Sequence, residues 1–224
     1  MSNFHTGQIS EINLQNIEFI ESRIFITLDI DWAHDDILEY SIDLVENLSV
    51  NATWFATHNT HLLDRIRSNP KFELGIHPNF NFLMEGDDCK GRNENEVIER
   101  MMDIVPEATA ARSHSLTSGS RILAAFKRHG ITHESNSFIP AYRSNFDVYP
   151  WEAVKGLTSV PFIWGDMHAS QQRSLNNGRE VLPPEQISRR NGLKVFNFHP
   201  IHLFINTNHI DDYEKTRPIH NDAM

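Results

Sequence analysis

Two acidic residues separated by one position form the pattern in this sequence that is best suited to chemistry. Asp29 and Asp31 follow an apolar, β-rich run. Because alternate residues of a strand point to the same side, both carboxylates should project together from its carboxyl end. Such carboxylates repel each other unless a cation or a shared proton compensates, and one can then act as a base while the other holds a metal. The alternative is that Asp31 caps the next helix and Asp29 only forms a turn.

Two histidines stand where other apolar runs stop. His77 follows residues 72–76, and His199 follows residues 193–198 and precedes Pro200, which ends strand pairing. In parallel α/β folds the carboxyl ends of strands carry ligands and catalytic groups. Either residue alone is also explained as a histidine that satisfies local hydrogen bonds. Their combination with the two acids favours a functional site.

Two further segments offer polar groups next to short apolar runs. Arg112 is costly to bury without a carboxylate partner, and Asp29 is the candidate partner. Strand-like alternation in a later segment predicts that Trp164, Asp166 and His168 share one face, where an acid can orient a histidine. Ordinary loop polarity is the alternative for both segments.

The elements that must position these residues alternate between short strands and amphipathic helices. Apolar runs of about 5 to 6 residues predict strands at residues 24–29, 52–56, 72–76, 108–112, 131–135, 160–164 and 193–198. Apolar residues at helical spacing predict helices over residues 37–48, 93–105 and 118–129. This alternation is typical of parallel strands joined by crossover helices, in a barrel or a wide sheet.

The rest of the chain is expected to form loops within a single domain that spans residues 1–224. Residues 178–192 are polar, contain two adjacent prolines and predict a connecting loop with one helical turn. The tail at residues 209–224 is polar and is expected to be partly ordered at most.

Composition excludes several classes of function. The 224 residues are 39% hydrophobic with 14 Phe and 4 Trp, so a core can form. A formal charge of −10 without a Lys/Arg cluster argues against a nucleic-acid partner. The single Cys89 excludes an internal disulfide and favours a reducing setting. No signal-like segment opens the chain and no apolar run reaches the ~18 to 20 residues of a membrane span, so a cytoplasmic location is expected.

The order of the motifs, from Asp29 to His199, resembles the polysaccharide deacetylase family, also called the NodB-homology or carbohydrate esterase family 4 group. The Asp29–Trp32 and His77–Asn81 segments look closest to short bacterial members associated with surface-polysaccharide assembly. The resemblance implies a distorted (β/α) barrel with about seven parallel strands. It also implies a divalent metal, with zinc expected and nickel or cobalt as alternatives.

The resemblance also assigns roles to the residues of the metal site. Asp31 and His77 look like metal ligands, and Asn81 stands where the family carries a second metal histidine. An amide oxygen suits harder cations than zinc prefers. This substitution leaves open a weaker site, a different ion, completion by His58 or His61, or loss of the metal.

The remaining motifs resemble the family's catalytic groups. Asp29 looks like the catalytic base, Arg112 like the arginine that orients it, and His199 like the general acid, with Asp166 as the acid that tunes the histidine. His114 occupies the position of a usual proline. By the same resemblance, residues expected to contact the substrate are Trp32 and Trp164.

The predicted function is therefore removal of an N-acetyl group from an amino sugar, or from its nucleotide- or lipid-linked precursor, in surface-polysaccharide biosynthesis. Asn81 keeps open a metal-free sugar-binding or scaffold protein with the same fold. A non-haem iron oxygenase built on two histidines and one carboxylate is a third interpretation, but it gives no role to Asp29.

Overall fold

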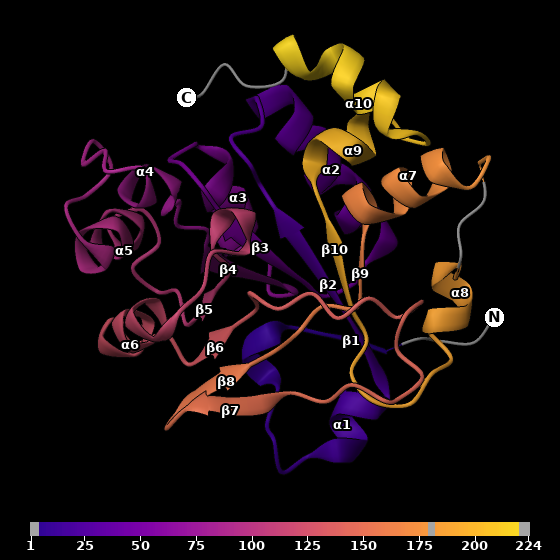
Figure 1. The fold of residues 1–224 in the computed structure, drawn as a ribbon, viewed down its shortest axis with the longest axis horizontal. Helices are drawn as coiled ribbons and strands as arrows, with labels where there is room; N and C mark the ends of the chain where they lie inside the picture. Colours follow the sequence, from indigo (N-terminus) through magenta and orange to yellow (C-terminus); the bar gives the residue numbers. More distant parts are fainter. Residues whose placement is uncertain (1–4, 179–181, 220–224) are drawn as a thin grey trace.

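A curled, mostly parallel β-sheet forms the centre of the molecule in the computed structural model, which describes residues 5–178 and 182–219 (Figure 1). The strands are β1 His5–Gly7, β2 Arg23–Asp29, β3 Ala52–Ala56, β4 Phe72–Ile76, β5 Ala110–Ala111, β6 His133–Glu134, β7 Trp151–Val154, β8 Leu157–Ser159, β9 Trp164–Gly165 and β10 Val195–Phe198. The strand order is β7-β8-β6-β5-β4-β3-β2-β10-β9, with β1 paired to β2. All pairs are parallel except β7 with β8. The sheet is an open half-barrel, which confirms the predicted α/β fold.

Helices connect the strands and cover the outside of the sheet (Figure 1). They are α1 Ile17–Glu21, α2 Asp35–Leu48, α3 Leu62–Ser68, α4 Asn81–Met84, α5 Glu94–Met102, α6 Ser120–Arg128, α7 Asp166–Leu175, α8 Pro184–Ile187, α9 Pro200–Phe204 and α10 Ile210–Thr216. Short 3-10 turns lie at Ile9–Glu11, His114–Leu116 and Arg217–Ile219. Among the described residues, no helix is long and apolar enough to cross a membrane.

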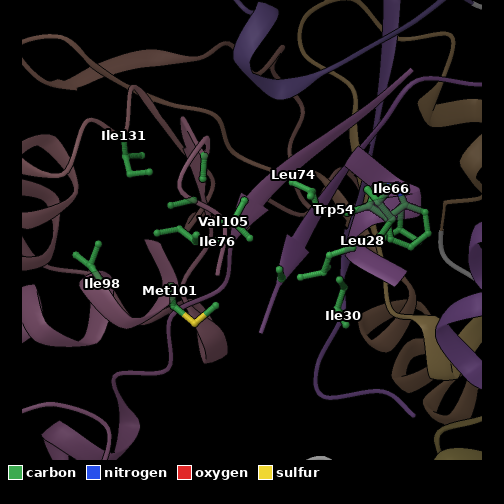
Figure 2. Packing of buried hydrophobic residues seen from close by; sticks show 14 of the residues in the cluster. Leu28, Ile30, Trp54, Ile66, Leu74, Ile76, Ile98, Met101, Val105 and Ile131 are labelled. Atoms are coloured by element: carbon green, nitrogen blue, oxygen red, sulfur yellow. The ribbon is translucent and has the colours of Figure 1, made fainter. Parts of the chain in front are cut away.

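The main core lies between the central strands and the helices that follow them (Figure 2). The central strands contribute three buried side chains to this core, Leu28 of β2, Trp54 of β3 and Leu74 of β4. Ile98 and Met101 of α5 belong to the same cluster. Removing each such side chain from water stabilises the fold by roughly 1.5 to 3 kcal/mol. This packing fixes the strands whose carboxyl ends carry the polar residues.

The strand register brings the predicted site residues to one edge of the sheet. Leu28 pairs with Phe198, so Asp29 and His199 follow neighbouring strands. Residues Ile76 and Ala111 pair in the same way, which puts His77 next to Arg112. Because the carboxyl ends of parallel strands lie at the same edge of the sheet, these four polar residues come close together without long loops.

Several predicted elements differ in length from the observed ones. The strand predicted at residues 108–112 is regular only over Ala110–Ala111, although the backbone amide of Arg112 still donates to the carbonyl of Ile76 at 3.0 Å. The strand predicted at residues 131–135 shrinks in the same way to β6, and the one predicted at residues 160–164 overlaps β9 only at Trp164. Strongly curved sheets limit regular pairing to short stretches, which propensity does not reveal.

Other elements were not predicted at all. The hairpin of β7 and β8 and helix α7 lie in segments with weak periodicity. Helix α8 matches the helical turn expected within residues 178–192. Within the tail predicted at residues 209–224, Ile210–Thr216 form helix α10, and residues 220–224 lie outside the described residues.

Candidate active site and metal centre

Asp29 and Arg112 form a buried ion pair at the base of the site. Arg112 Nη1 donates to Asp29 Oδ1 at 2.9 Å, and the two side chains are 0% and 5% exposed. Asn197 Nδ2 donates to Asp29 Oδ2 at 2.9 Å, while its own Oδ1 accepts from Arg112. Burial alone would raise the pKa of Asp29, but the positive charge of Arg112, together with His77 and His199, lowers it. Asp29 is therefore an ionised carboxylate with a fixed orientation.

Arg112 is held on every side, which explains how a guanidinium is tolerated in the interior. Its Nε and Nη2 donate to the backbone carbonyl and hydroxyl of Ser135 at 2.9 and 2.7 Å. The guanidinium lies 4.7 Å from the ring centroid of Phe55 and 4.9 Å from that of Phe162. Hydrogen bonds and cation–π contacts together offset the cost of burying its charge.

Asp31 lies in a strained turn beyond the strand and faces two histidines. Its backbone φ is +47°, and that of Trp32 is +54°, values that residues other than glycine rarely adopt. Asp31 Oδ1 lies 3.2 Å from His77 Nε2 and 3.2 Å from His114 Nδ1. Burial would raise the pKa of Asp31, but hydrogen bonds from His114 and His77 hold it well below its usual value. Strain of this kind persists where the surroundings fix an unusual geometry, as at functional sites.

The chemistry of this donor set fits a divalent metal ion. One atom from each of Asp31, His77 and His114 can be chosen so that all three lie within 4.8 Å of one another. Two imidazoles and one carboxylate are a donor set of catalytic zinc sites, which leave a further position for water or substrate. The other ring nitrogen of His77 lies 3.8 Å from Asp29 Oδ1, which is beyond hydrogen-bond distance, so the nearby carboxylate contributes charge there rather than a hydrogen bond.

Asn81, predicted as a metal ligand, is engaged elsewhere. Its Nδ2 donates to Ser115 Oγ at 3.1 Å, and its Oδ1 accepts from Thr117 Oγ1 at 3.3 Å. Asn81 opens helix α4, so its side chain crosses to the 3-10 turn that carries His114. The structure thus brings His114, rather than Asn81, to Asp31 and His77.

The two histidines considered as substitutes for Asn81 also lie outside this group. His61 Nδ1 lies 3.3 Å from Asp35 Oδ2 in an exposed position. His58 Nδ1 lies 3.0 Å from Thr57 Oγ1. His114 was noticed in the sequence only as a departure from a proline, and its distance along the chain from His77 hid its role.

His199 is held by Asp166 and faces the two carboxylates. Its Nδ1 lies 2.7 Å from Asp166 Oδ1, and its backbone amide donates to Asp166 Oδ2 at 2.6 Å. The free ring nitrogen, Nε2, lies 3.7 Å from both Asp29 Oδ2 and Asp31 Oδ2. Burial opposes protonation, but the charges of Asp166, Asp31 and Asp29 outweigh it and raise the pKa of His199 to about 10. At neutral pH this imidazole is therefore in its charged, doubly protonated form and lies near both carboxylates.

The alternation predicted for Trp164, Asp166 and His168 is wrong, because helix α7 begins at Asp166. The Asp166 carboxylate accepts from the backbone amide of Met167 at 2.7 Å, as acids at the start of a helix do. Trp164 packs between Phe196 and Phe198. The structure therefore keeps Asp166 at the site but removes Trp164 from it.

A cavity of about 280 Å³ opens above these groups. Its polar side carries the carboxylates and imidazoles, and its apolar side is formed by Leu116, Phe162 and Met167. His168 also lines it and packs on Phe138 with ring centroids 4.1 Å apart. A cavity of this size and character suits part of a sugar with a small apolar substituent.

Two further residues complete the description of the site. Asn197 was missed by sequence reasoning, although its position two residues before His199 on one strand is a signal that period-2 alternation offers. His202 is buried, and its Nδ1 lies 2.9 Å from Thr207 Oγ1. One donor atom from each of His202, Asp166 and His199 also falls within a 4.8 Å group.

Comparison with known proteins identifies the family of this chain. The family model for WbmS-like polysaccharide deacetylases matches residues 26–217. The sequence matches no curated protein. A crystal structure from Bordetella bronchiseptica, of a protein assigned to the polysaccharide deacetylases and to O-antigen biosynthesis, is 35% identical with a TM-score of 0.86. That similarity covers 100% of this chain and 90% of the other.

More distant structures share less of the fold. A protein from Mycobacterium smegmatis assigned to the polysaccharide deacetylases is 15% identical, with a TM-score of 0.47 over 79% of this chain and 77% of the other. A family 4 carbohydrate esterase from Streptomyces lividans, in complex with acetate, is 12% identical, with a TM-score of 0.48 over 87% and 86%. With the family model covering nearly the whole chain and the Bordetella structure matching along its full length, this chain belongs to the polysaccharide deacetylase family.

Proposed function

We propose that this protein removes the acetyl group from an N-acetylated amino sugar by metal-assisted hydrolysis. One observation carries the proposal. A single cavity is bordered by an ionised carboxylate held by an arginine, a protonated histidine held by a second carboxylate, and a group of one carboxylate and two imidazoles. Hydrolysis of an amide needs a base, an acid and a means of polarising the carbonyl, and these groups supply all three.

The third group of side chains is suited to hold the metal. Asp31, His77 and His114 are the proposed ligands, and zinc is the proposed ion because this donor set is common in catalytic zinc sites. Nickel and cobalt accept the same nitrogen and oxygen donors. When bound, such an ion acidifies a water molecule and polarises a carbonyl oxygen.

Asp29 is the proposed base. Each of its carboxylate oxygens accepts one hydrogen bond, from Arg112 or Asn197, and keeps a further lone pair for a proton. Its low pKa keeps it ionised at neutral pH, so it can accept a proton from the attacking water. Arg112 and Asn197 fix the direction in which that proton is taken.

His199 is the proposed acid. With Nδ1 held by Asp166, the Nε2 proton points towards the carboxylates and the reacting group. As the carbon–nitrogen bond breaks, the electron pair stays on nitrogen, which takes this proton and leaves as an amine. The other product is acetate, whose new oxygen comes from water. A pKa of about 10 keeps His199 protonated for this step at neutral pH.

The sugar is proposed to belong to a surface polysaccharide or to one of its precursors. Support comes from the Bordetella protein that is 35% identical over the full chain, because that protein is assigned to O-antigen biosynthesis. The cavity is open to solvent on one side and bordered by apolar side chains on another, as required for a sugar that carries an acetyl group.

The two other functions considered have less support. A metal-free binding or scaffold protein was suggested by Asn81, but His114 offers a second imidazole next to Asp31 and His77. An iron oxygenase also uses two histidines and one carboxylate. It gives no role to the ion pair of Asp29 with Arg112, nor to a histidine that stays protonated at neutral pH.

Acetate release by the purified protein tests the proposal. Supplied with zinc and N-acetylated amino sugars, the protein should release acetate, and a chelator should stop the reaction. Asp29→Asn and His199→Ala should each lower the rate by about 10² or more. Asp36→Asn and His61→Ala remove an exposed acid and an exposed imidazole outside the site and serve as matched controls. Full activity in either site variant would refute the assigned roles.

A further inference from the structure

A second cavity, of about 250 Å³, adjoins the active site and takes no part in the reaction described above. The two cavities share His77 in their walls, and Trp32, the residue after Asp31, lines the second one. The backbone amide of Trp32 donates to Thr57 Oγ1 at 2.9 Å, and this hydrogen bond holds the strained turn at Asp31 and Trp32 in place. Because the two cavities share a wall residue, a substrate bound at the carboxylates can extend into the second cavity.

Two cations with no anionic partner border this cavity. Lys90 and Arg100 line it, and neither forms an ion pair with any residue in the described part of the chain. Arg100 Nη1 donates to the backbone carbonyl of Cys89 at 3.2 Å, which holds the guanidinium near Lys90. No described lining residue of the cavity is an aspartate or a glutamate. In a chain with 30 acidic and 20 basic residues, the lining of this cavity thus offers two cations and no carboxylate, although Arg100 also borders a neighbouring surface hollow together with Asp88, Glu96, Glu99 and Asp103.

The remaining lining supplies neutral donors and an apolar floor. Asn59 and Asn79 offer amide groups, and Val97 and Met101 of α5 lie beneath them. Burial, opposed by the charge of Asp35, lowers the pKa of His58, so this imidazole is neutral at neutral pH. Lys90 and Arg100 are therefore the two cations that the lining of the cavity offers to an anion.

We propose that this second cavity binds an anionic group, a phosphate ester or a carboxylate, that is covalently attached to the amino sugar. The inference rests on the proposed function, because it assigns the charge of that same substrate. Guanidinium and ammonium groups bind the oxygens of phosphate and carboxylate with charge-assisted hydrogen bonds. Trp32 lines the cavity, and an indole ring is a surface on which a sugar ring can stack. The substrate class is thus an acidic or phosphorylated N-acetylamino sugar rather than a neutral one.

Binding of matched probes to the zinc-supplemented full chain tests this assignment. The probes are N-acetylglucosamine 1-phosphate, N-acetylglucosaminuronic acid and neutral methyl N-acetylglucosaminide, each with its galacto epimer. Titrations followed by NMR give dissociation constants, and acetate release is visible in the same spectra. At least one anionic probe should bind about tenfold or more tightly than the neutral glycoside, since the free energy of one hydrogen bond between charged groups corresponds to about that change in affinity. A preference for the phosphate ester or for the uronate identifies the source of the charge.

Variants of the two cations complete the test. The double variant Lys90→Gln with Arg100→Gln should bring the affinity for the anionic probes to that of the neutral glycoside. Arg121→Gln with Lys155→Gln removes the same charge at exposed positions outside the cavity and should keep the preference. Equal binding of all probes, no detectable binding, or an unchanged preference in the cavity variant overturns the proposal. If acetate is released but the anionic probes bind no more tightly than the neutral one, the anion site is contradicted and the deacetylase function is not. If the anionic probes bind more tightly but no acetate is released, the deacetylase function is contradicted and the anion site is not.

Discussion

At the scale of single residues, the site depends on contacts between groups far apart in the sequence. Asp31 meets His77 and His114 within 3.2 Å, and Asp29 meets Arg112 and Asn197 within 2.9 Å. Asp29 ends β2 and Asp31 lies two residues further along, whereas their partners come from β10 or from the segments after β4 and β5. The two carboxylates at the end of β2 therefore form a negatively charged centre, and the partner side chains of the other strands and loops surround it.

The first prediction concerns the third metal ligand. His114→Ala should weaken zinc binding by more than about 100-fold, because loss even of groups that only orient a ligand costs 10- to 100-fold. Asn81→Ala should leave the affinity within a few-fold, since its side chain is hydrogen-bonded to Ser115 and Thr117. Competition with a chromophoric chelator measures both affinities. Strong zinc binding by the His114 variant, with loss in the Asn81 variant, would restore the assignment suggested by sequence.

The second prediction concerns the pH dependence set by Asp166. A histidine whose pKa is raised on folding stabilises the fold fully below its unfolded value, ~6.5, and loses that contribution as the pH rises through its folded value of about 10. Asp166→Asn removes the charge that raises this pKa. Urea unfolding of chelator-treated protein gives the free energy of unfolding at pH 6 and at pH 10. The decrease in this free energy between the two pH values should be smaller in the variant than in the unmodified protein, by at least about 1 kcal/mol. An equal loss in both proteins would contradict the role given to Asp166.

Sequence reasoning at this scale succeeded where a residue ends an apolar run and failed where it does not. Asp29, His77 and His199 were recognisable because Asp29 ends, and each histidine directly follows, a strand with a clear hydrophobic pattern. His114 lies in a 3-10 turn after a two-residue strand, and Asn197 lies inside a strand among apolar residues. No local pattern marks His114, and Asn197 is marked only by its spacing of two residues from His199, because the contacts that matter are with other strands.

At the scale of elements, predictability followed the length of the element. Strands β3 and β4 have the predicted bounds, since each has five residues that are mostly buried and apolar and so leave a strong signal. Strands β5, β6 and β9 have two residues each and are defined by pairing rather than by composition. Helix α7 was missed because its sequence is mostly polar and its start depends on the contact between Asp166 and His199.

The third prediction tests how much the buried face of β2 contributes to stability. Leu28 is 0% exposed and lies one residue before Asp29, whereas Leu48 at the end of α2 is 62% exposed. Leu28→Ala should lower the free energy of unfolding by about 2 to 5 kcal/mol, and Leu48→Ala by less than about 0.5 kcal/mol. Urea denaturation measures both. Similar losses for the two variants would show that burial at β2 does not govern the fold.

At the scale of the whole molecule, the open half-barrel gathers three loops at one edge. Asp31 follows β2, His77 follows β4 and His114 follows β5, and these strands are held together by the same core (Figure 2). The α/β class and the convergence of strand ends were predictable from alternating strand and helix patterns. The curl that turns a wide sheet into a half-barrel was not, because it arises from the cumulative twist of many strand pairs.

The fourth prediction follows from this arrangement. An ion bound by three loops from different strands binds the folded state and not the unfolded chain, so it should stabilise the fold by mass action. Free zinc at 100 times its dissociation constant should add about 2.7 kcal/mol to the free energy of unfolding, and a chelator should remove that gain. His61→Ala keeps all three ligands and should keep the gain, whereas His114→Ala should lose it at the same zinc concentration. Thermal unfolding with and without zinc measures the effect for each variant. An equal gain in the His114 variant would mean that the stabilising ion lies elsewhere, and the metal centre would then have to be sought outside the cavity that contains Asp29 and His199.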